Sequence, residues 1–448
     1  MTNRTAPPQS AVLPIYKLPP VHEKRLSNGL LLVTVEDKRF PIVTARLGFS
    51  AGSKYDPPEL PGLSETTAAL LTEGTAGRTS RQIAEEVANI GGALHADSSA
   101  DFLVVAASAL SENLPKLLEL TADVVRNAVF PEDEVALRKE NRQQELAAQR
   151  SDAGYLADVK FTEVIFSPHP YAWQDPTPES IERLSRTVLA DFKERLLIPN
   201  NAVLVLLGAL PDRNELEDLV TSCFGEWEPG EIPTQHPQKS SEPRRSVVLV
   251  DRPGSVQTDL RIGRLAITRT DPDYFPLLVA NTIFGGGASS RMFANIREKE
   301  GFAYDARSAV SPLKESGSFA AVTQVRNEVL VAAVEAVLGE MEQIAAHEVS
   351  AEELSTAQNY LSGVFVIRIE TQDGLAGQVA AVKLLGLPID YLERYTTRVR
   401  SVTPEQIRRA AARYISPEAA SIVAVGDAAA IAGQLGKFGE VTVTKAGE

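Results

Sequence analysis

The chain has 448 residues, of which 44% are hydrophobic and 23% charged, and its formal net charge at pH 7 is −14. A chain of this length exceeds what one hydrophobic core usually supports, so we expect at least two domains. The acidic balance argues against a nucleic-acid partner and against an anionic membrane surface, because binding to either requires a cationic protein face.

No segment of the sequence indicates a membrane protein. Apolar runs stay well short of the roughly 20 residues that a spanning helix needs. The first 25 residues are polar and proline-rich, without the apolar stretch of a signal peptide. The sequence as printed therefore predicts a cytoplasmic protein, and a periplasmic one only if a leader had been trimmed from it. Its single cysteine, Cys223, excludes an internal disulfide.

The first half of the chain has the pattern of an α+β unit. Asn28-Gly29, flanked by alternating apolar residues, predicts a β-hairpin with a two-residue turn. A helix is expected after Pro61-Gly62, with a buried stripe that includes Leu63 and Ala69 and an end at Gly74. Other strands and helices of this half are expected at 43–49, 79–90, 93–98, 101–107, 114–150, 153–165, 178–196, 201–208 and 213–223.

A polar, proline-rich stretch over 229–245 has no apolar periodicity and predicts an inter-domain linker. The sequence therefore divides into an N-terminal half at 1–228 and a C-terminal half at 246–448. In the second half the order of elements starts again, with strands and helices expected at 246–251, 258–265, 273–284, 328–348, 351–369 and 420–427.

Two local patterns recur between the halves. Arg46-Leu-Gly matches Arg261-Ile-Gly, and the helix, proline and buried strand within 189–208 match those within 402–426. Both pairs are offset by roughly 215 residues, which indicates a duplicated unit. We therefore predict an α+β fold of two similar halves, each an antiparallel sheet covered by helices.

Short motifs occur along nearly the whole chain: Leu26-Ser-Asn-Gly-Leu, Pro61-Gly-Leu, Glu73-Gly-Thr, His169-Pro-Tyr, Pro199-Asn-Asn-Ala-Val, Asp251-Arg-Pro-Gly, Gly285-Gly-Gly-Ala-Ser-Ser-Arg and Ile296-Arg-Glu-Lys-Glu-Gly-Phe-Ala-Tyr. In type and order they resemble the insulinase, pitrilysin and mitochondrial processing peptidase family of zinc metallopeptidases. Any one motif is weak, but together they are specific. The resemblance implies two similar α+β halves, in agreement with the repeat.

The resemblance also implies where a zinc site would lie. Members of the family carry His-x-x-Glu-His on one helix, with two zinc-binding imidazoles and a glutamate as general base. Aligned on that frame, the first histidine falls at Glu65, the base at Ala68 and the second histidine at Ala69. Only the third-ligand position keeps its residue type, as Glu145. This implies a chain without catalytic residues or zinc of its own, in which Glu145 pairs with a basic neighbour.

A second group of candidates lies in the C-terminal half. In the family an arginine and a tyrosine at the spacing of Arg297 and Tyr304 bind the substrate peptide opposite the zinc. The alternative is a surface arginine and the first residue of a buried strand. Gly285, Gly286 and Gly287 are further candidates for substrate contact, because glycines allow positive φ and close approach of another backbone. A tight loop between helices also explains them.

The resemblance implies the non-catalytic, substrate-binding subunit of a heteromeric zinc peptidase. Its partner would be a homologous chain with an intact His-x-x-Glu-His, which supplies the zinc and the general base, and its substrate an enclosed peptide. Two alternatives stay open. One is a non-proteolytic scaffold or peptide-binding protein, like the core proteins of respiratory complex III. The other is an inactive homodimer that traps peptides.

Overall fold

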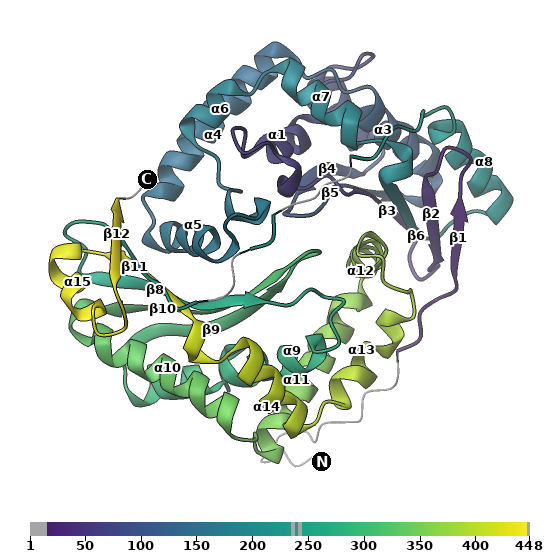
Figure 1. Cartoon of the computed structure of the whole chain (residues 1–448). Coiled ribbons are helices and arrows are strands. Elements are labelled where there is room, and N and C mark those ends of the chain that lie inside the picture. Colours follow the sequence, from purple (N-terminus) through teal and green to yellow (C-terminus); the bar gives the residue numbers. More distant parts are fainter. Residues whose placement is uncertain (1–15, 234–237, 241–243, 446–448) are drawn as a thin grey trace, which may run out of the picture.

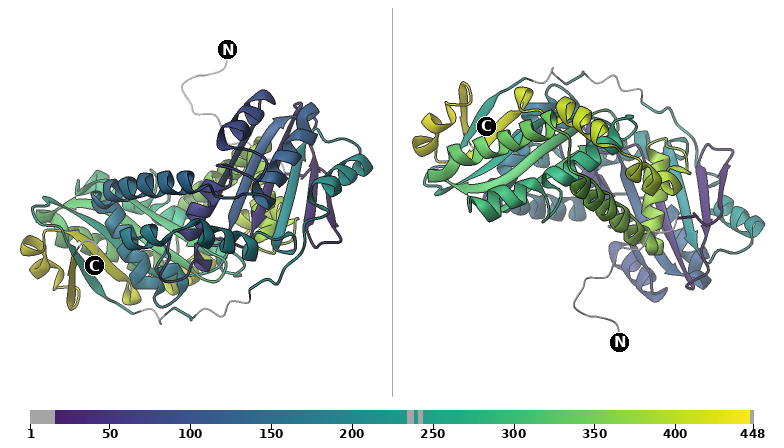
Figure 2. Two further views of the ribbon diagram at one scale, coloured as in Figure 1. Left: turned by 90° about the horizontal axis from the view of Figure 1, so that it is seen from above. Right: turned by 90° about the horizontal axis from the view of Figure 1, so that it is seen from below.

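The computed structural model describes residues 16–233, 238–240 and 244–445. Within them, two six-stranded sheets covered by helices form two halves, one above the other in Figure 1. Figure 2 shows the halves inclined to each other, with helices on the outside of both. This arrangement confirms the predicted α+β class and the two similar halves.

The two sheets have matching strand orders. The order is β1-β2-β6-β3-β5-β4 in the first sheet and β12-β7-β11-β8-β10-β9 in the second. The outer strand beside β2 comes from the start of the chain, and the one beside β7 comes from its end. The strands are β1 (Val21–Arg25), β2 (Leu31–Glu36), β3 (Ile42–Phe49), β4 (Ala93–Ser98), β5 (Leu103–Leu110), β6 (Ala202–Gly208), β7 (Val247–Asp251), β8 (Gln257–Ala266), β9 (Ala303–Pro312), β10 (Gly317–Arg326), β11 (Ser421–Gly426) and β12 (Val441–Lys445).

The sheets differ from the expectation in one detail, because they are mixed and not wholly antiparallel. β2 pairs with β6 and β7 with β11 in parallel, and β12 also runs parallel to β7. In each half the chain passes through a long series of helices before it returns to the middle of the sheet, and such crossovers permit parallel pairing.

Helices make up most of the remaining structure. The α-helices are α1 (Leu63–Leu70), α2 (Ser80–Asn89), α3 (Leu114–Arg126), α4 (Glu132–Arg150), α5 (Ala153–Phe166), α6 (Pro178–Arg183), α7 (Arg186–Leu196), α8 (Arg213–Phe224), α9 (Tyr274–Gly285), α10 (Leu330–Ala346), α11 (Ala351–Glu370), α12 (Gln372–Leu384), α13 (Tyr391–Arg400), α14 (Pro404–Tyr414) and α15 (Ala428–Leu435). Shorter turns are η1 (Ser53–Tyr55), η2 (Ser111–Asn113), η3 (Pro170–Ala172), η4 (Pro199–Asn201), η6 (Asn327–Val329), η7 (Pro417–Ala419) and the π-helical η5 (Phe293–Lys299).

The predicted hairpin and the predicted first helix are both present, with different ends. β1 and β2 pair through Arg25 and Leu31, so the connecting loop has five residues and not two. Asn28 is buried there and donates hydrogen bonds to two backbone carbonyls at the end of α8 and just after it. Helix α1 ends at Leu70, four residues before the predicted Gly74, and Ala69 is only half-buried.

One helix of each half packs on the sheet of the other half, and we call these two the borrowed helices. Helix α5 of the first half packs on β8 and β11, and α12 of the second half packs on β3 and β6 (Figure 1). The recurring Arg-x-Gly pattern lies at both contacts. Arg46 forms an ion pair with Asp373 of α12, and Arg261 with Asp158 of α5 at 2.5 Å.

The glycine of each pattern makes room for the borrowed helix. A Cβ on Gly48 would lie 2.6 Å from Leu384 of α12, and one on Gly263 would lie 2.9 Å from Phe161 of α5. The sequence repeat therefore marks the two places where the halves exchange helices. The division at 1–228 and 246–448 stays a prediction about folding units, and the described residues of the stretch 229–245 form neither helix nor strand.

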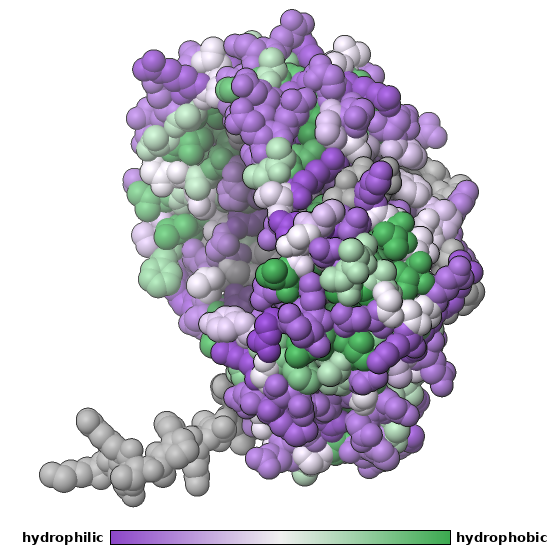
Figure 3. All heavy atoms as spheres, turned by 90° about the vertical axis from the view of Figure 1, so that its left-hand side faces the viewer, coloured by the Kyte–Doolittle hydropathy of each residue, from purple (hydrophilic) through white to green (hydrophobic). Residues whose placement is uncertain are grey.

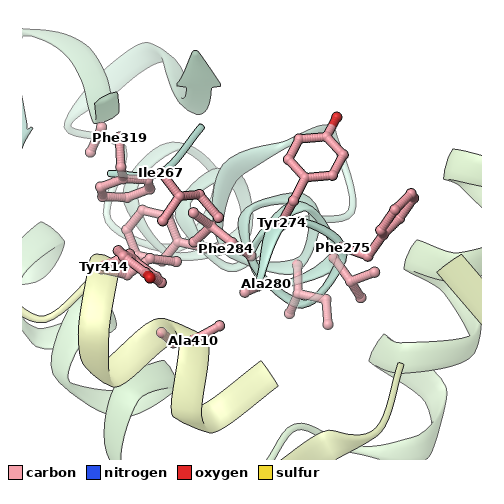
Figure 4. Packing of buried hydrophobic residues seen from close by; sticks show 14 of the residues in the cluster. Ile267, Tyr274, Phe275, Ala280, Phe284, Phe319, Ala410 and Tyr414 are labelled. Carbon is pink, nitrogen blue, oxygen red and sulfur yellow. The ribbon is translucent and has the colours of Figure 1, made fainter. Parts of the chain in front are cut away.

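The largest apolar cluster joins both halves. It contains α9, α10 and α14 on the outer face of the second sheet, together with valines of β2 and β6 that contact the borrowed α12. Figure 4 shows its centre, where Phe284 of α9 and Phe319 of β10 meet edge to face with ring centroids 5.6 Å apart. This continuous core holds η5 and the start of β9, where the second group of candidate residues lies.

Candidate functional site

The acidic residues at two of the predicted metal-ligand positions share two arginines. Glu65 lies on α1, and Glu145, Arg138 and Arg142 lie on α4. Arg138 reaches both carboxylates, with its Nη2 3.1 Å from Glu65 Oε1 and its Nη1 3.2 Å from Glu145 Oε1. Arg142 places Nε 3.2 Å from Glu65 Oε1 and Nη1 3.9 Å from Glu145 Oε2. We call these four residues the Arg–Glu cluster.

The start of α1 is fixed by a residue outside the helix. Gly62 precedes the helix with φ +91°, and its N–H donates to Asp56 Oδ2 at 3.0 Å. Ser64 N–H donates to Asp56 Oδ1 at 2.9 Å. Burial raises the pKa of Asp56 to about 7, against these hydrogen bonds, which lower it. Asp56 thus caps the first turn of the helix from outside it.

The donor set does not fit a catalytic zinc ion. Such an ion needs three protein ligands, usually with imidazole among them. Here Ala68 and Ala69 offer no donor atom, and both carboxylates are already paired with guanidinium groups. Across the described residues, no group of three or more His, Cys, Asp or Glu side chains is placed to hold a metal. Glu145 does have basic neighbours, as expected from the sequence, and they are Arg138 and Arg142.

Arg297 and Tyr304 lie together in the second half. Arg297 is on η5, and Tyr304 is the second residue of β9. The guanidinium carbon of Arg297 lies 4.5 Å from the ring centroid of Phe293 and 4.9 Å from that of Tyr304. The Tyr304 side chain is 87% exposed. Tyr304 thus lies at the start of a strand, as the alternative expects, but its side chain is not buried.

Within the described residues, no hydrogen bond or ion pair uses the guanidinium N–H groups of Arg297. A guanidinium that packs on an aromatic ring can still donate hydrogen bonds from its N–H groups. No carboxylate within the described part of the chain pairs with Arg297. The contrast with the Arg–Glu cluster is clear, because Arg138 and Arg142 both contact carboxylates.

The three glycines have different surroundings. None of them has positive φ, so the predicted conformational freedom is not used. The predicted close approach occurs at Gly285, where a Cβ would lie 2.4 Å from Ser308 Oγ and 2.6 Å from Ser308 N in β9. Gly287 faces open space. Gly286 and Gly287 line a cavity of about 470 Å³, together with the first turns of α11 and Tyr360.

An ion cluster that sequence patterns did not predict joins the two halves, with Lys54, Asp101 and His169 buried and Glu315 partly exposed. Glu315, at the tip between β9 and β10, reaches Lys54 Nζ at 2.5 Å and His169 Nε2 at 3.2 Å. Lys54 Nζ also lies 3.3 Å from Asp101 Oδ1, which accepts a hydrogen bond from Tyr171 at 2.5 Å. Hydrogen bonding to His169, and then to Lys54, lowers the pKa of Glu315 to about 2. The motif His169-Pro-Tyr indicated that His169 and Tyr171 have a structural role. It did not indicate that their partners are Glu315 and Asp101.

The surface seen in Figure 3 is mainly hydrophilic, with a hollow on one side of that face. Among the helices of the described residues, none combines the length and the apolar character needed to cross a bilayer. The cytoplasmic location stays a prediction.

Two family models match the chain. Residues 31–164 match the model described as Insulinase (Peptidase family M16), and residues 183–361 match the model described as Peptidase M16 inactive domain. Together these segments make up more than half of the chain.

Several known proteins are similar over most of their length. An uncharacterized zinc protease of Streptomyces coelicolor is 24% identical over 414 residues, which cover 91% of this chain and 89% of that protein. An uncharacterized zinc protease of Rickettsia bellii is 29% identical over 347 residues, covering 75% of this chain and 81% of that protein.

Solved structures show the same architecture. A peptidase M16 inactive domain from Pseudomonas fluorescens matches with a TM-score of 0.85 and 27% identity, covering 91% of this chain and 98% of that one. A protease from Helicobacter pylori matches with a TM-score of 0.83 and 19% identity, covering 92% of this chain and 100% of that one. The second likeness concerns the fold alone.

Proposed function

Because the chain belongs to the insulinase family of peptidases, family M16, we propose that it is a non-catalytic, peptide-binding subunit of a heteromeric zinc peptidase. A homologous partner with an intact His-x-x-Glu-His supplies the zinc ion and the general base. The observation that carries the proposal is the different use of arginine at the two candidate sites. In the first half two arginines form ion pairs with Glu65 and Glu145, and in the second half Arg297 contacts two aromatic rings and has no ion-pair partner in the described residues.

The Arg–Glu cluster supports the non-catalytic part. Its two carboxylates and two guanidinium groups sum to no net charge, so the cluster offers little attraction to a divalent cation. Ala68 stands where the general base would be, and a methyl group cannot take a proton from water. Several relatives carry the name zinc protease. The family resemblance implies that a zinc enzyme has histidines where this chain has Glu65 and Ala69, and a glutamate where it has Ala68.

The Arg297–Tyr304 pair supports the peptide-binding part. Forked N–H donors suit the carbonyl oxygens of an extended peptide or a carboxylate. The exposed ring of Tyr304 adds an apolar surface with one polar group. Phe293 and Tyr304 hold the guanidinium in place before a ligand arrives, which lowers the entropy lost on binding.

Two sheet edges offer a way to bind an extended chain. β4 and β9 are end strands of their sheets, so one side of each has unpaired N–H and C=O groups. β4 contacts α1, and β9 begins with the residues around Tyr304. Addition of a peptide strand to such an edge uses backbone hydrogen bonds and tolerates many sequences.

The scaffold alternative has less support, because a purely structural role needs no half-buried arginine that contacts two aromatic rings and has no ion-pair partner in the described residues. The homodimer alternative predicts peptide binding without any catalytic partner. Both alternatives are decided by the same experiment, in which the chain is purified alone and together with a homologue that carries His-x-x-Glu-His.

Zinc content, oligomeric state and cleavage of a quenched fluorescent peptide are measured for each sample. We expect cleavage from the pair and none from this chain alone. Zinc-dependent cleavage by the chain alone would falsify the proposal. Failure of the two chains to associate, with peptide binding by this chain alone, would favour the homodimer.

A further inference from the structure

A pocket of about 290 Å³ lies at one end of the second sheet, away from both candidate sites. It is formed where β7 and β11 begin, β8 ends and α5 reaches its last turn. Two arginines and three serines line it, with five aliphatic side chains: Val164, Ile165, Val248, Leu265 and Ala419. No acidic side chain is among the residues that line it.

One of the two arginines, Arg264 on β8, has no counter-ion within reach. Its Nε is buried and has no hydrogen-bond partner among the described residues, and no carboxylate there forms an ion pair with it. Burial lowers the pKa of Arg264, opposed by the more distant charge of Glu418, which is exposed. Arg264 as a whole is half-buried, whereas Arg261, three residues earlier on the same strand, is buried and pairs with Asp158.

A buried polar group without a partner is rare in folded proteins, because it costs free energy that nothing repays. An acceptor that reached the Nε of Arg264 would therefore be bound favourably, all the more because no carboxylate in the described residues pairs with this guanidinium. The cavity beside Arg264 has room for that acceptor.

The serines position the second arginine at the rim. Ser246 O–H donates to Ser421 Oγ at 2.9 Å, and Ser421 O–H donates to the backbone carbonyl of Arg244 at 3.4 Å. These bonds link the residue before β7 and the first residue of the parallel β11 to the backbone that carries Arg244. The Arg244 residue is exposed and lines the same pocket as Arg264.

We propose that this pocket binds a carboxylate that carries a short aliphatic group. Arg264 pairs with the carboxylate from inside and Arg244 from the rim, since a planar guanidinium fork matches the two oxygens of a carboxylate. The aliphatic side chains of the pocket accept the apolar part of the ligand. Such a ligand is either a free short-chain acid or the C-terminal residue of a peptide.

The test is isothermal titration of the full chain at constant ionic strength. The probes are hexanoate for the free acid and N-acetylleucine for a peptide C-terminus. Hexanol, which has the aliphatic tail but no carboxylate, and inorganic phosphate, which has negative charge but no tail, are the controls. Arg264→Gln is expected to weaken carboxylate binding at least about tenfold, which is about 1.4 kcal/mol. Arg81→Gln is the matched control, because Arg81 is exposed and lies on α2.

The tighter of the two carboxylates identifies the source of the ligand. The proposal is overturned if neither carboxylate binds, if hexanol or phosphate binds as tightly, or if Arg264→Gln binds like the wild type. A second measurement excludes a misfolded variant. Arg264→Gln removes a half-buried charge that has no ion-pair partner in the described residues, so its melting temperature without ligand is expected to equal or exceed that of the wild type. A lower melting temperature with unchanged binding would instead assign Arg264 a structural role.

Discussion

The Arg–Glu cluster and the Arg297–Tyr304 pair place the same chemical group in opposite settings. In the cluster, two arginines contact two carboxylates and join α1 to α4. At the pair, one arginine is held between two rings and has no carboxylate partner in the described chain. A charge satisfied inside the protein contributes to stability, and a charge left free can bind something else. The two regions should therefore respond differently to mutation.

The largest effect is expected from Arg142→Ala. The Arg142 side chain is 8% exposed and contacts both Glu65 and Gln149. Its loss removes a nearly fully buried side chain, takes the Arg142 donor from Gln149 and leaves Glu65 with Arg138 alone. The free energy of unfolding should fall by about 3 kcal/mol. Urea denaturation checks this, with Arg81→Ala expected to cost at most about 0.5 kcal/mol. Equal effects of the two changes would show that the cluster does not hold the helices together.

A slightly smaller effect is expected from Gly285→Ala. The new Cβ would lie within 2.6 Å of the backbone nitrogen of Ser308, so α9 would have to shift away from β9. We expect a loss of about 2 kcal/mol in the free energy of unfolding. Gly287→Ala is the control, because nothing lies within 4 Å of its Cβ, and should change stability little. If both changes weakened peptide binding without affecting stability, the glycines would belong to the binding surface.

The junction between the halves should show a specific pH dependence. The pKa of Glu315 is lowered from its ordinary value of 4.5 to about 2, so its charge stabilises the folded chain fully above pH 4.5. That stability is lost as the pH falls from 4.5 toward 2. Glu315→Gln should cost about 1.5 kcal/mol at neutral pH, a value reduced by partial exposure of the carboxylate. The difference in free energy of unfolding between wild type and Glu315→Gln, measured by urea denaturation, should shrink as the pH falls from 4.5 toward 2. A difference that stays constant with pH would contradict the ion pairing.

The smallest effect on stability is expected from Arg297→Ala, which should instead change binding. Arg297 makes no ion pair within the described chain, so the free energy of unfolding should change by less than about 0.5 kcal/mol. In the reconstituted pair, KM for a test peptide should rise about tenfold, which corresponds to the loss of one charged hydrogen bond. Arg297→Lys keeps the charge but not the planar fork, so its KM should lie between those of the wild type and Arg297→Ala. Unchanged kinetics would leave Arg297 without a role in binding.

Much of the fold follows from local sequence patterns. The matching Arg46-Leu-Gly and Arg261-Ile-Gly predicted a duplication, and the structure confirms it. What the pattern could not reveal is that each arginine holds a helix of the opposite half. Helix α12 was not predicted, because it contains Gly374 and Gly377 and is buried between the two halves, so it lacks a single polar face.

The candidate sites were also predictable only in part, because the sequence shows local spacing but not contacts between distant elements. Arg138, Arg142 and Glu145 recur at helical spacing, so their proximity was visible in the sequence. Contact with Glu65 was not, because α1 and α4 are brought together only by the tertiary fold. The stacking of Phe293 on Arg297 depends likewise on the π-helical turn of η5, which apolar periodicity does not predict.

The most direct test follows binding and integrity of one labelled peptide with the purified chain alone, in the presence of added zinc. Fluorescence anisotropy reports binding, and mass spectrometry of the same sample reports cleavage. The proposed role predicts saturable binding that Arg297→Ala weakens about tenfold, with the peptide intact after prolonged incubation. Zinc-dependent cleavage, or no binding by the wild-type chain, would contradict it.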